Sequence, residues 1–118
     1  MVKLVEGTPG VFFHYCPGCR DFHYFHTAYK NRSDASWTFD GNMEQPTFHP
    51  SMNIGPSYCH YWLRNGKIEF LGDCHHELKG QTVDIPEFER DDPILGELLD
   101  MVVEMVARRA PANPILPP

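Results

Sequence analysis

The sequence contains no apolar run near the roughly 20 residues that a membrane-spanning helix needs. Its first ten residues, MVKLVEGTPG, lack the apolar core of a signal peptide. Basic residues are scarce, because ten Lys and Arg stand against sixteen Asp and Glu and leave a net charge of −6. Proteins that bind duplex nucleic acid through its phosphates carry the opposite sign. We therefore expect a cytoplasmic protein that binds neither a membrane nor duplex nucleic acid.

The length of 118 residues fits one hydrophobic core and leaves no room for a second domain of ordinary size. Eleven Pro and nine Gly favour turns over long helices. The last eight residues, PANPILPP, read as a proline-rich extension. We expect a single zinc-stapled domain over 1–110 and a proline-rich C-terminal tail over 111–118.

The pattern of short alternating runs predicts an α+β fold. Residues 10–28 read as a hairpin around the turn Cys16-Pro17-Gly18-Cys19, and residues 58–71 read as two strands joined by Asn65-Gly66 in a type I′ turn. Asp92-Pro93 is typical of a helix start, and apolar residues then recur at three and four as far as Arg108-Arg109. We predict a small antiparallel β-sheet with zinc-knuckle hairpins and one C-terminal amphipathic helix. The predicted apolar stripe of this helix consists of Ile94, Leu95, Leu98, Leu99, Met101, Val102, Met105 and Val106.

Cysteine is confined to four residues, which favours metal ligands over a disulfide framework in a cytoplasmic chain. The two-residue spacing of Cys16 and Cys19 is usual for zinc. Cys59 and Cys74 fall on one face of the second hairpin and complete a closed, structural Zn²⁺ site of four thiolates, with His76 or His23 as alternative ligands. Two further interpretations stay open: buried structural thiols, and a catalytic metal bound by His75 or His76.

The register expected for the second hairpin also predicts a candidate catalytic group. If Arg64 faces Lys67, then His60 and Asp73 are diagonal neighbours on the face opposite Cys59. An imidazole beside a carboxylate suits a general base, and Ser51 is a candidate nucleophile if the chain returns across this face. The alternatives are a surface His–Asp pair with Ser51 capping a turn, and Cys59 as a nucleophile activated by His60. His14, His23 and His26 are expected to face solvent.

Several motifs resemble a family of bacteriophage and prophage proteins of unassigned function, often labelled ammonia monooxygenase, a label that nothing in this chain supports. The resemblance covers about residues 11–86 and rests on the CPGC knuckle, Trp37 and Phe39, PTFHPS, and CHYWLRNGKIEFLGDCHHELKGQTVDIP. Tyr61 departs from the family, which usually has Ser there. The resemblance implies a phage protein in the cytoplasm of its bacterial host.

The chain is also distantly similar to small proteins of bacterial ubiquitin-like conjugation operons, for which a serine-peptidase role has been suggested. The shared features are the Cys16–Cys19 knuckle, Pro50-Ser51 and the hairpin His60-Tyr61-Trp62. This similarity implies a serine-type hydrolase that uses Ser51, His60 and Asp73 on a protein or peptide substrate, such as a host ubiquitin-like protein. A non-catalytic zinc-binding interaction module and a metal-dependent hydrolase are the two alternatives.

Overall fold

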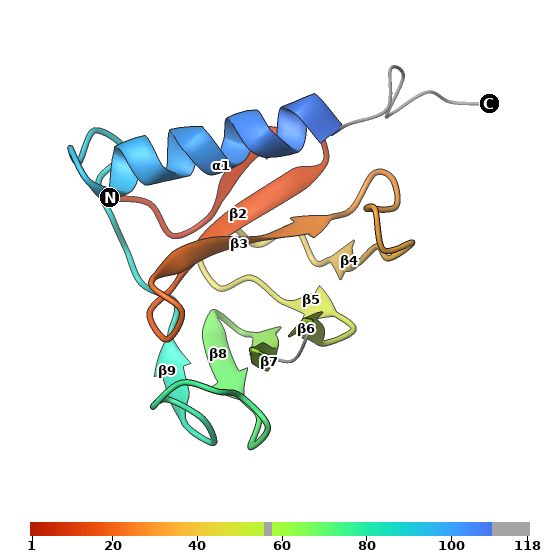
Figure 1. Ribbon diagram of the computed structural model, residues 1–118, viewed down its shortest axis with the longest axis vertical. Helices are drawn as coiled ribbons and strands as arrows, with labels where there is room; N and C mark the ends of the chain where they lie inside the picture. The colour runs from red at the N-terminus through yellow and green to blue at the C-terminus, as the bar shows by residue number, and fades with distance from the viewer. Residues whose placement is uncertain (56–57, 110–118) are drawn as a thin grey trace.

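The computed structural model describes residues 1–55 and 58–109 (Figure 1). Its strands form three antiparallel sheets, in the orders β1-β2-β3, β4-β5 and β6-β7-β8-β9. The predicted α+β class, with antiparallel strands and one C-terminal helix, is confirmed, although the strands divide among three sheets instead of one. The expected tail over 111–118 lies outside the described residues. The elements are β1 (Val5–Thr8), β2 (Val11–Cys16), β3 (Asp21–His26), β4 (Thr38–Phe39), β5 (Phe48–His49), β6 (Met52–Ile54), β7 (Cys59–Arg64), β8 (Lys67–Phe70), β9 (Thr82–Asp84) and α1 (Leu95–Arg109).

The β7–β8 hairpin has the predicted turn and register. Asn65 and Gly66 both have positive φ, 51° and 73°, as a type I′ turn requires. Arg64 pairs with Lys67, so the odd-numbered side chains of β7 point inward and are at most 1% exposed. The even-numbered side chains point to the opposite face and are only partly buried. This alternation fixes which residues of β7 belong to the core and which are available for chemistry.

The helix α1 covers one face of the sheet β1-β2-β3 (Figure 1). Asp92 caps it as predicted, since its Oδ1 accepts hydrogen bonds from the backbone N–H groups of Ile94 and Leu95, both at 2.8 Å. Leu99 is fully buried against the sheet. Ile94 and Met101 are 75% and 69% exposed, so their placement in the apolar stripe was wrong. The stripe is narrower than predicted because residues of the sheet contact only one side of the helix.

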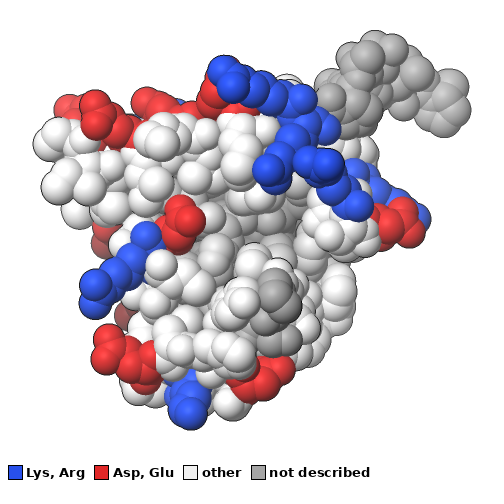
Figure 2. Space-filling model, in the orientation of Figure 1, with Lys and Arg blue, Asp and Glu red and all other residues white. Residues whose placement is uncertain are grey.

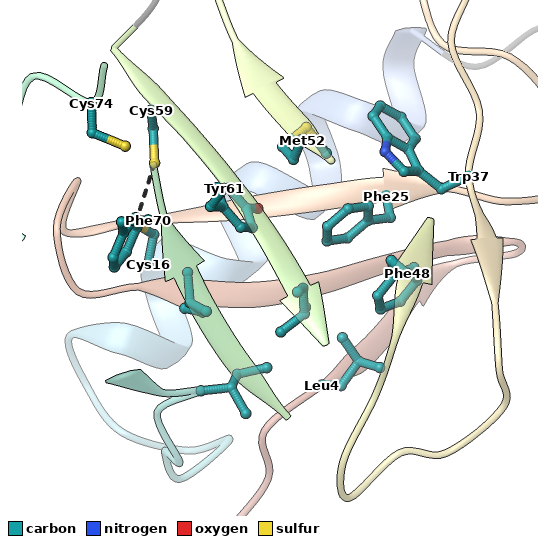
Figure 3. Close-up of a cluster of buried hydrophobic side chains, with 13 residues drawn as sticks. Leu4, Cys16, Phe25, Trp37, Phe48, Met52, Cys59, Tyr61, Phe70 and Cys74 are labelled. Carbon is teal, nitrogen blue, oxygen red and sulfur yellow. Dashed lines mark hydrogen bonds between the residues drawn. The ribbon is translucent and has the colours of Figure 1, made fainter. Parts of the chain in front are cut away.

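The other face of the sheet β1-β2-β3 packs against the sheet that contains β7. Figure 3 shows Phe25, Phe48 and Trp37 between these layers, with the rings of Phe25 and Phe48 stacked 4.1 Å apart. The sheet β1-β2-β3 is therefore covered on both faces. For this reason His14, His23 and His26 are buried, at most 7% exposed, and the expectation that they face solvent was wrong.

Tyr61 joins the two layers through a buried polar chain. Its hydroxyl lies 2.7 Å from His14 Nε2 and 3.2 Å from His23 Nδ1. Burial lowers the pKa of His14 to about 4 and that of His23 to about 3, so both rings are neutral at pH 7. One hydroxyl can donate to one ring and accept from the other, which satisfies all three groups.

Replacing Tyr61 with Phe is expected to lower the free energy of unfolding by about 1–3 kcal/mol, because two buried imidazole nitrogens lose their partner. Urea denaturation followed by circular dichroism measures the change. Tyr58→Phe is the matched control, since Tyr58 is 53% exposed and its loss should change stability by less than about 0.5 kcal/mol. Equal effects of the two substitutions would contradict a role for the Tyr61 hydroxyl.

Candidate functional site

A serine, a histidine and an aspartate meet on the outward face of β7. Ser51 Oγ lies 3.3 Å from His60 Nε2, and Asp73 Oδ2 lies 3.0 Å from His60 Nδ1. The structure thus brings together all three residues that the sequence suggested for this face. The order Ser–His–Asp, with one ring nitrogen toward each neighbour, is the arrangement found in serine hydrolases.

Three neighbouring segments of one sheet supply these side chains. His60 lies on β7, which runs between β6 and β8. Asn53 pairs with His60, so Ser51, two residues earlier, is a diagonal neighbour on the same face. Asp73 comes from the turn that follows β8. The central strand thus carries the histidine, and its two sides supply the hydroxyl and the carboxylate.

The electrostatics of the group fix the tautomer of His60. The hydrogen bond from His60 lowers the pKa of Asp73, so the carboxylate is ionised at neutral pH. An ionised carboxylate accepts a hydrogen bond from the N–H at His60 Nδ1, which leaves the lone pair of Nε2 facing Ser51 Oγ. His60 is 24% exposed and Asp73 is 58% exposed, so solvent reaches both. In this state His60 can accept a proton from the serine hydroxyl.

Cys74 holds the backbone of this group in place. The N–H of His60 donates to Cys74 Sγ at 3.2 Å, and the Cys74 thiol donates to the His60 carbonyl at 3.0 Å. Leu71 N–H donates to the same carbonyl at 2.9 Å. The buried thiol therefore ties the turn that carries Asp73 to the strand that carries His60.

Ser51 lies in a groove of about 780 Å³ between β3, β6, the loop over 31–37 and the last turns of α1. Both strands lie at the edge of their sheets, with β3 on one wall and β6 on the other. The wall near Ser51 includes Trp37, whose indole N–H donates to the Ser51 carbonyl at 3.2 Å. The serine is thus reached from a long groove with two strand edges.

Three thiols and one imidazole form a second cluster, on the buried side of β7. The donor atoms of Cys16, Cys19, Cys59 and His76 all lie within 4.8 Å of one another. Cys16 Sγ lies 4.0 Å from Cys59 Sγ, and Cys59 Sγ lies 3.5 Å from His76 Nε2. Figure 3 shows Cys16 and Cys59 in contact, with Cys74 beside them. The cluster therefore matches the alternative ligand set, in which His76 takes the place of Cys74.

The other proposed ligands lie elsewhere. Cys74 is engaged with the backbone of His60, and the His23 ring faces the Tyr61 hydroxyl. His75 packs its ring against Tyr58 at 5.6 Å. Cys59 points away from His60, into the cluster, so the two do not form a nucleophile and base pair. The hairpin pattern correctly placed Cys74 on the buried side of the sheet, but it did not predict that the thiol contacts the backbone of His60.

The cluster fits a tetrahedral zinc ion. Ideal Zn–S bonds place two sulfurs about 3.8 Å apart, close to the 4.0 Å between Cys16 and Cys59. The knuckle has the usual N–H to sulfur contact, since Cys19 N–H donates to Cys16 Sγ at 3.3 Å. Leu78 N–H donates to His76 Nδ1 at 3.2 Å. Ligation through Nε2 would move the ring proton to Nδ1 and break this contact with Leu78.

The thiols resist joint ionisation unless a cation is present. A hydrogen bond from Cys59 lowers the pKa of Cys16 to about 7, and the same bond raises the pKa of Cys59. Burial and the neighbouring Cys16 raise the pKa of Cys19 to about 11. Cys16 is therefore the thiol of the three that ionises most readily, and a divalent ion would supply the charge that three thiolates need. Four protein ligands would leave such an ion without an open position, which suits a structural role.

The model of one protein family, described as the bacterial ubiquitination-like system serine protease (BubE), matches residues 2–71. The chain belongs to this family. The match with the BubE family includes Ser51 and His60 and stops short of Asp73. It confirms the similarity to peptidases of ubiquitin-like conjugation operons, while the phage origin stays a prediction.

No curated protein and no solved structure matches the chain. Among residues 1–55 and 58–109, no helix has the length and apolarity to cross a membrane.

Cys16→Ser is expected to abolish zinc binding, and Cys74→Ser is expected to retain one zinc per chain, because Cys16 belongs to the cluster and Cys74 does not. Native mass spectrometry of protein purified without chelators measures the number of zinc ions per chain. His76→Ala should weaken binding as well, by about 10-fold or more. Loss of zinc from Cys74→Ser combined with retention by His76→Ala would instead establish a site of four thiolates.

Proposed function

We propose that this protein is a serine-type peptidase or isopeptidase whose nucleophile is Ser51. The observation that carries the proposal is the contact of Ser51 Oγ with His60 Nε2 at 3.3 Å, with Asp73 on the other ring nitrogen. The BubE family match supports it, because that family is described as serine proteases. The substrate is a protein, and the operon context of the family suggests a ubiquitin-like protein of the host.

In the first half of the reaction, Ser51 Oγ attacks the carbonyl carbon of the scissile bond and His60 Nε2 takes its proton. Collapse of the tetrahedral intermediate breaks the C–N bond, and His60 returns that proton to the leaving amine. In the second half, water attacks the acyl ester, with the same nitrogen taking and returning a proton, and restores Ser51. Asp73 stabilises the imidazolium in both halves and holds the ring in place.

Backbone N–H groups beside Ser51 are available for the oxyanion. His60 directs its backbone toward β8, where Leu71 donates to its carbonyl. Its pair on β6, Asn53, therefore directs its own N–H and carbonyl away from β7, toward the outer edge. Ser51, two residues before Asn53, directs its backbone groups the same way, and its carbonyl accepts a hydrogen bond from the indole N–H of Trp37. The N–H groups of Ser51 and Asn53 are thus candidates to stabilise the oxyanion.

The groove favours an extended substrate segment. The other wall of the groove is β3. The His26 carbonyl accepts a hydrogen bond from the backbone N–H of Trp37, so the even-numbered residues of β3 direct their backbone groups away from β2. Tyr24 is one of these residues and lines the groove. A peptide that enters between β3 and β6 can therefore pair with strand edges on either side. The folded body of a ubiquitin-like protein would not enter such a groove, whereas its extended C-terminus would.

Zinc has a structural role in this proposal. Cys16, Cys19, Cys59 and His76 would hold the ion, and the bound ion would join the β2–β3 turn to the start of β7. Cys59 is adjacent to His60, so the ion would also fix the strand that carries the general base. A metal-dependent hydrolase needs an exchangeable position on its ion, and four protein ligands do not provide one.

A fluorophosphonate probe tests the nucleophile without knowledge of the substrate. Mass spectrometry is expected to find the wild-type protein labelled once, on Ser51. Ser51→Ala should not be labelled, and His60→Ala should be labelled about 10²- to 10⁴-fold more slowly, because the base is absent. Asp73→Asn should also be slower, since the ring loses its ionised partner.

Ser36→Ala is the control, since Ser36 lines the same groove and has no basic partner among the described hydrogen bonds. Its labelling rate should equal that of the wild type. A folded wild-type protein that leaves Ser51 unlabelled would refute the proposal and favour a non-catalytic zinc-binding interaction module.

A further inference from the structure

A second pocket adjoins the groove. It has a volume of about 370 Å³ and lies between the loop that follows β3 and the last turn of α1. Four residues line both spaces, so the pocket and the groove share part of their walls; they are Tyr24, Asn31, Ser33 and Arg109. A substrate segment that runs along the groove past Ser51 would therefore come close to this pocket.

The pocket is basic in a chain that is acidic overall. Lys30, Arg32 and Arg109 line it, and its lining includes no Asp or Glu, although the net charge of the chain is −6. Lys30 is partly neutralised by Asp34 at 3.4 Å, whereas neither guanidinium has a carboxylate within 4 Å in the described part of the chain. Figure 2 shows Lys and Arg gathered at this end of the helix, with most visible acidic side chains elsewhere.

Two buried polar atoms of the pocket lack partners. His26 is 7% exposed, and its Nδ1 has no hydrogen-bond partner among the described residues. The hydroxyl of Tyr29 is likewise buried and unpaired, and both side chains line the pocket. Both atoms have almost no accessible surface, so a hydrogen-bond acceptor in the pocket would reach them after a small movement of the two rings, which pack edge to face at 5.2 Å. Because unpaired buried polar atoms are costly, such a movement would stabilise both groups.

We propose that this pocket binds a carboxylate of the peptide substrate and so sets how the substrate lies in the groove leading to Ser51. The proposal rests on the proposed peptidase function. Planar guanidinium groups bind carboxylates through paired hydrogen bonds, here from Arg32 and Arg109. Tyr29 O–H and the neutral His26 ring, with its proton on Nδ1, add two further donors. The carboxylate belongs either to an acidic side chain or to the chain terminus of the substrate.

One feature of the fold opposes an anion in this place. The pocket lies at the C-terminal end of α1, where the free carbonyl groups carry a partial negative charge. That charge amounts to about half an elementary charge, while the guanidinium groups of Arg32 and Arg109 line the pocket beside the partly neutralised Lys30. The side chains therefore outweigh the helix, and a small anion is the ligand that the balance favours.

Fluorescence anisotropy tests the pocket on the full chain with Ser51→Ala, which cannot cleave. The probes are fluorescein-labelled Gly/Ser decapeptides with an amidated C-terminus and one Glu at each position in turn, the same peptide without Glu, and the same peptide with a free C-terminal carboxylate. At least one carboxylate peptide is expected to bind about tenfold more tightly than the neutral one. The Glu series and the free terminus distinguish the two sources of the carboxylate.

The double variant Arg32→Gln/Arg109→Gln is expected to abolish the tenfold preference. Arg90→Gln/Arg108→Gln is the matched control, because it makes the same change in net charge at two residues that line neither space and that pair with Asp100 and Glu104. It should retain the preference. A carboxylate peptide should also shift the ring nitrogen signals of His26 in a long-range ¹H–¹⁵N spectrum.

Equal binding of carboxylate and neutral peptides, no binding of either, or equal losses in the two double variants would overturn the proposal. These outcomes are separate from the test of Ser51, because binding is measured in a variant that lacks the nucleophile. Carboxylate-dependent binding together with a wild-type Ser51 that resists the fluorophosphonate would retain the pocket and refute the peptidase.

Discussion

The contact between the Cys16-Cys19 knuckle and Cys59 is the constraint on which the rest of the arrangement depends. It joins the turn of the β2–β3 hairpin to the first residue of β7, where Cys16 and Cys59, 43 residues apart in the sequence, have their sulfurs 4.0 Å from each other. Because side chains alternate along a strand, a buried Cys59 forces His60 to the outward face and Tyr61 back into the core. One buried junction therefore determines where the outward chemistry of β7 can occur.

The core also positions the groups around His60. Cys74 holds the turn of Asp73 against the strand, and the pairing of Asn53 with His60 brings Ser51 to the other side of the ring. Cys74 is held by hydrogen bonds to the backbone of His60, and Ser51 by the register of β6 against β7, so the geometry does not depend on long flexible side chains. A site with this construction is preorganised, which is what a general base near a weak nucleophile requires.

The sequence predicted the local geometry well and the long-range packing poorly. Asn65-Gly66 fixed one register, and that register alone placed His60 beside Asp73. The register placed Cys74 on the correct face, but β8 ends at Phe70 and the chain then turns, so the alternative ligand His76 reaches the thiols in its place. The sequence did not predict the burial of His14 and His26. The alternation of side chains along a strand separates its two faces, but it does not show that a helix covers one face and a second sheet covers the other. The groove and its basic pocket were missed because their walls come from distant segments.

The adjacency of Cys59 and His60 affects how such an enzyme would respond to inhibitors. A chelator that removed a structural ion would release the start of β7 and displace the base, and activity would fall although no metal takes part in the reaction. Sensitivity to chelators would then coexist with labelling by serine reagents, and a screen that relied on chelators alone would assign the wrong protease type. Thiol-modifying reagents would mislead in the same way, because the sulfurs they attack support the site from behind.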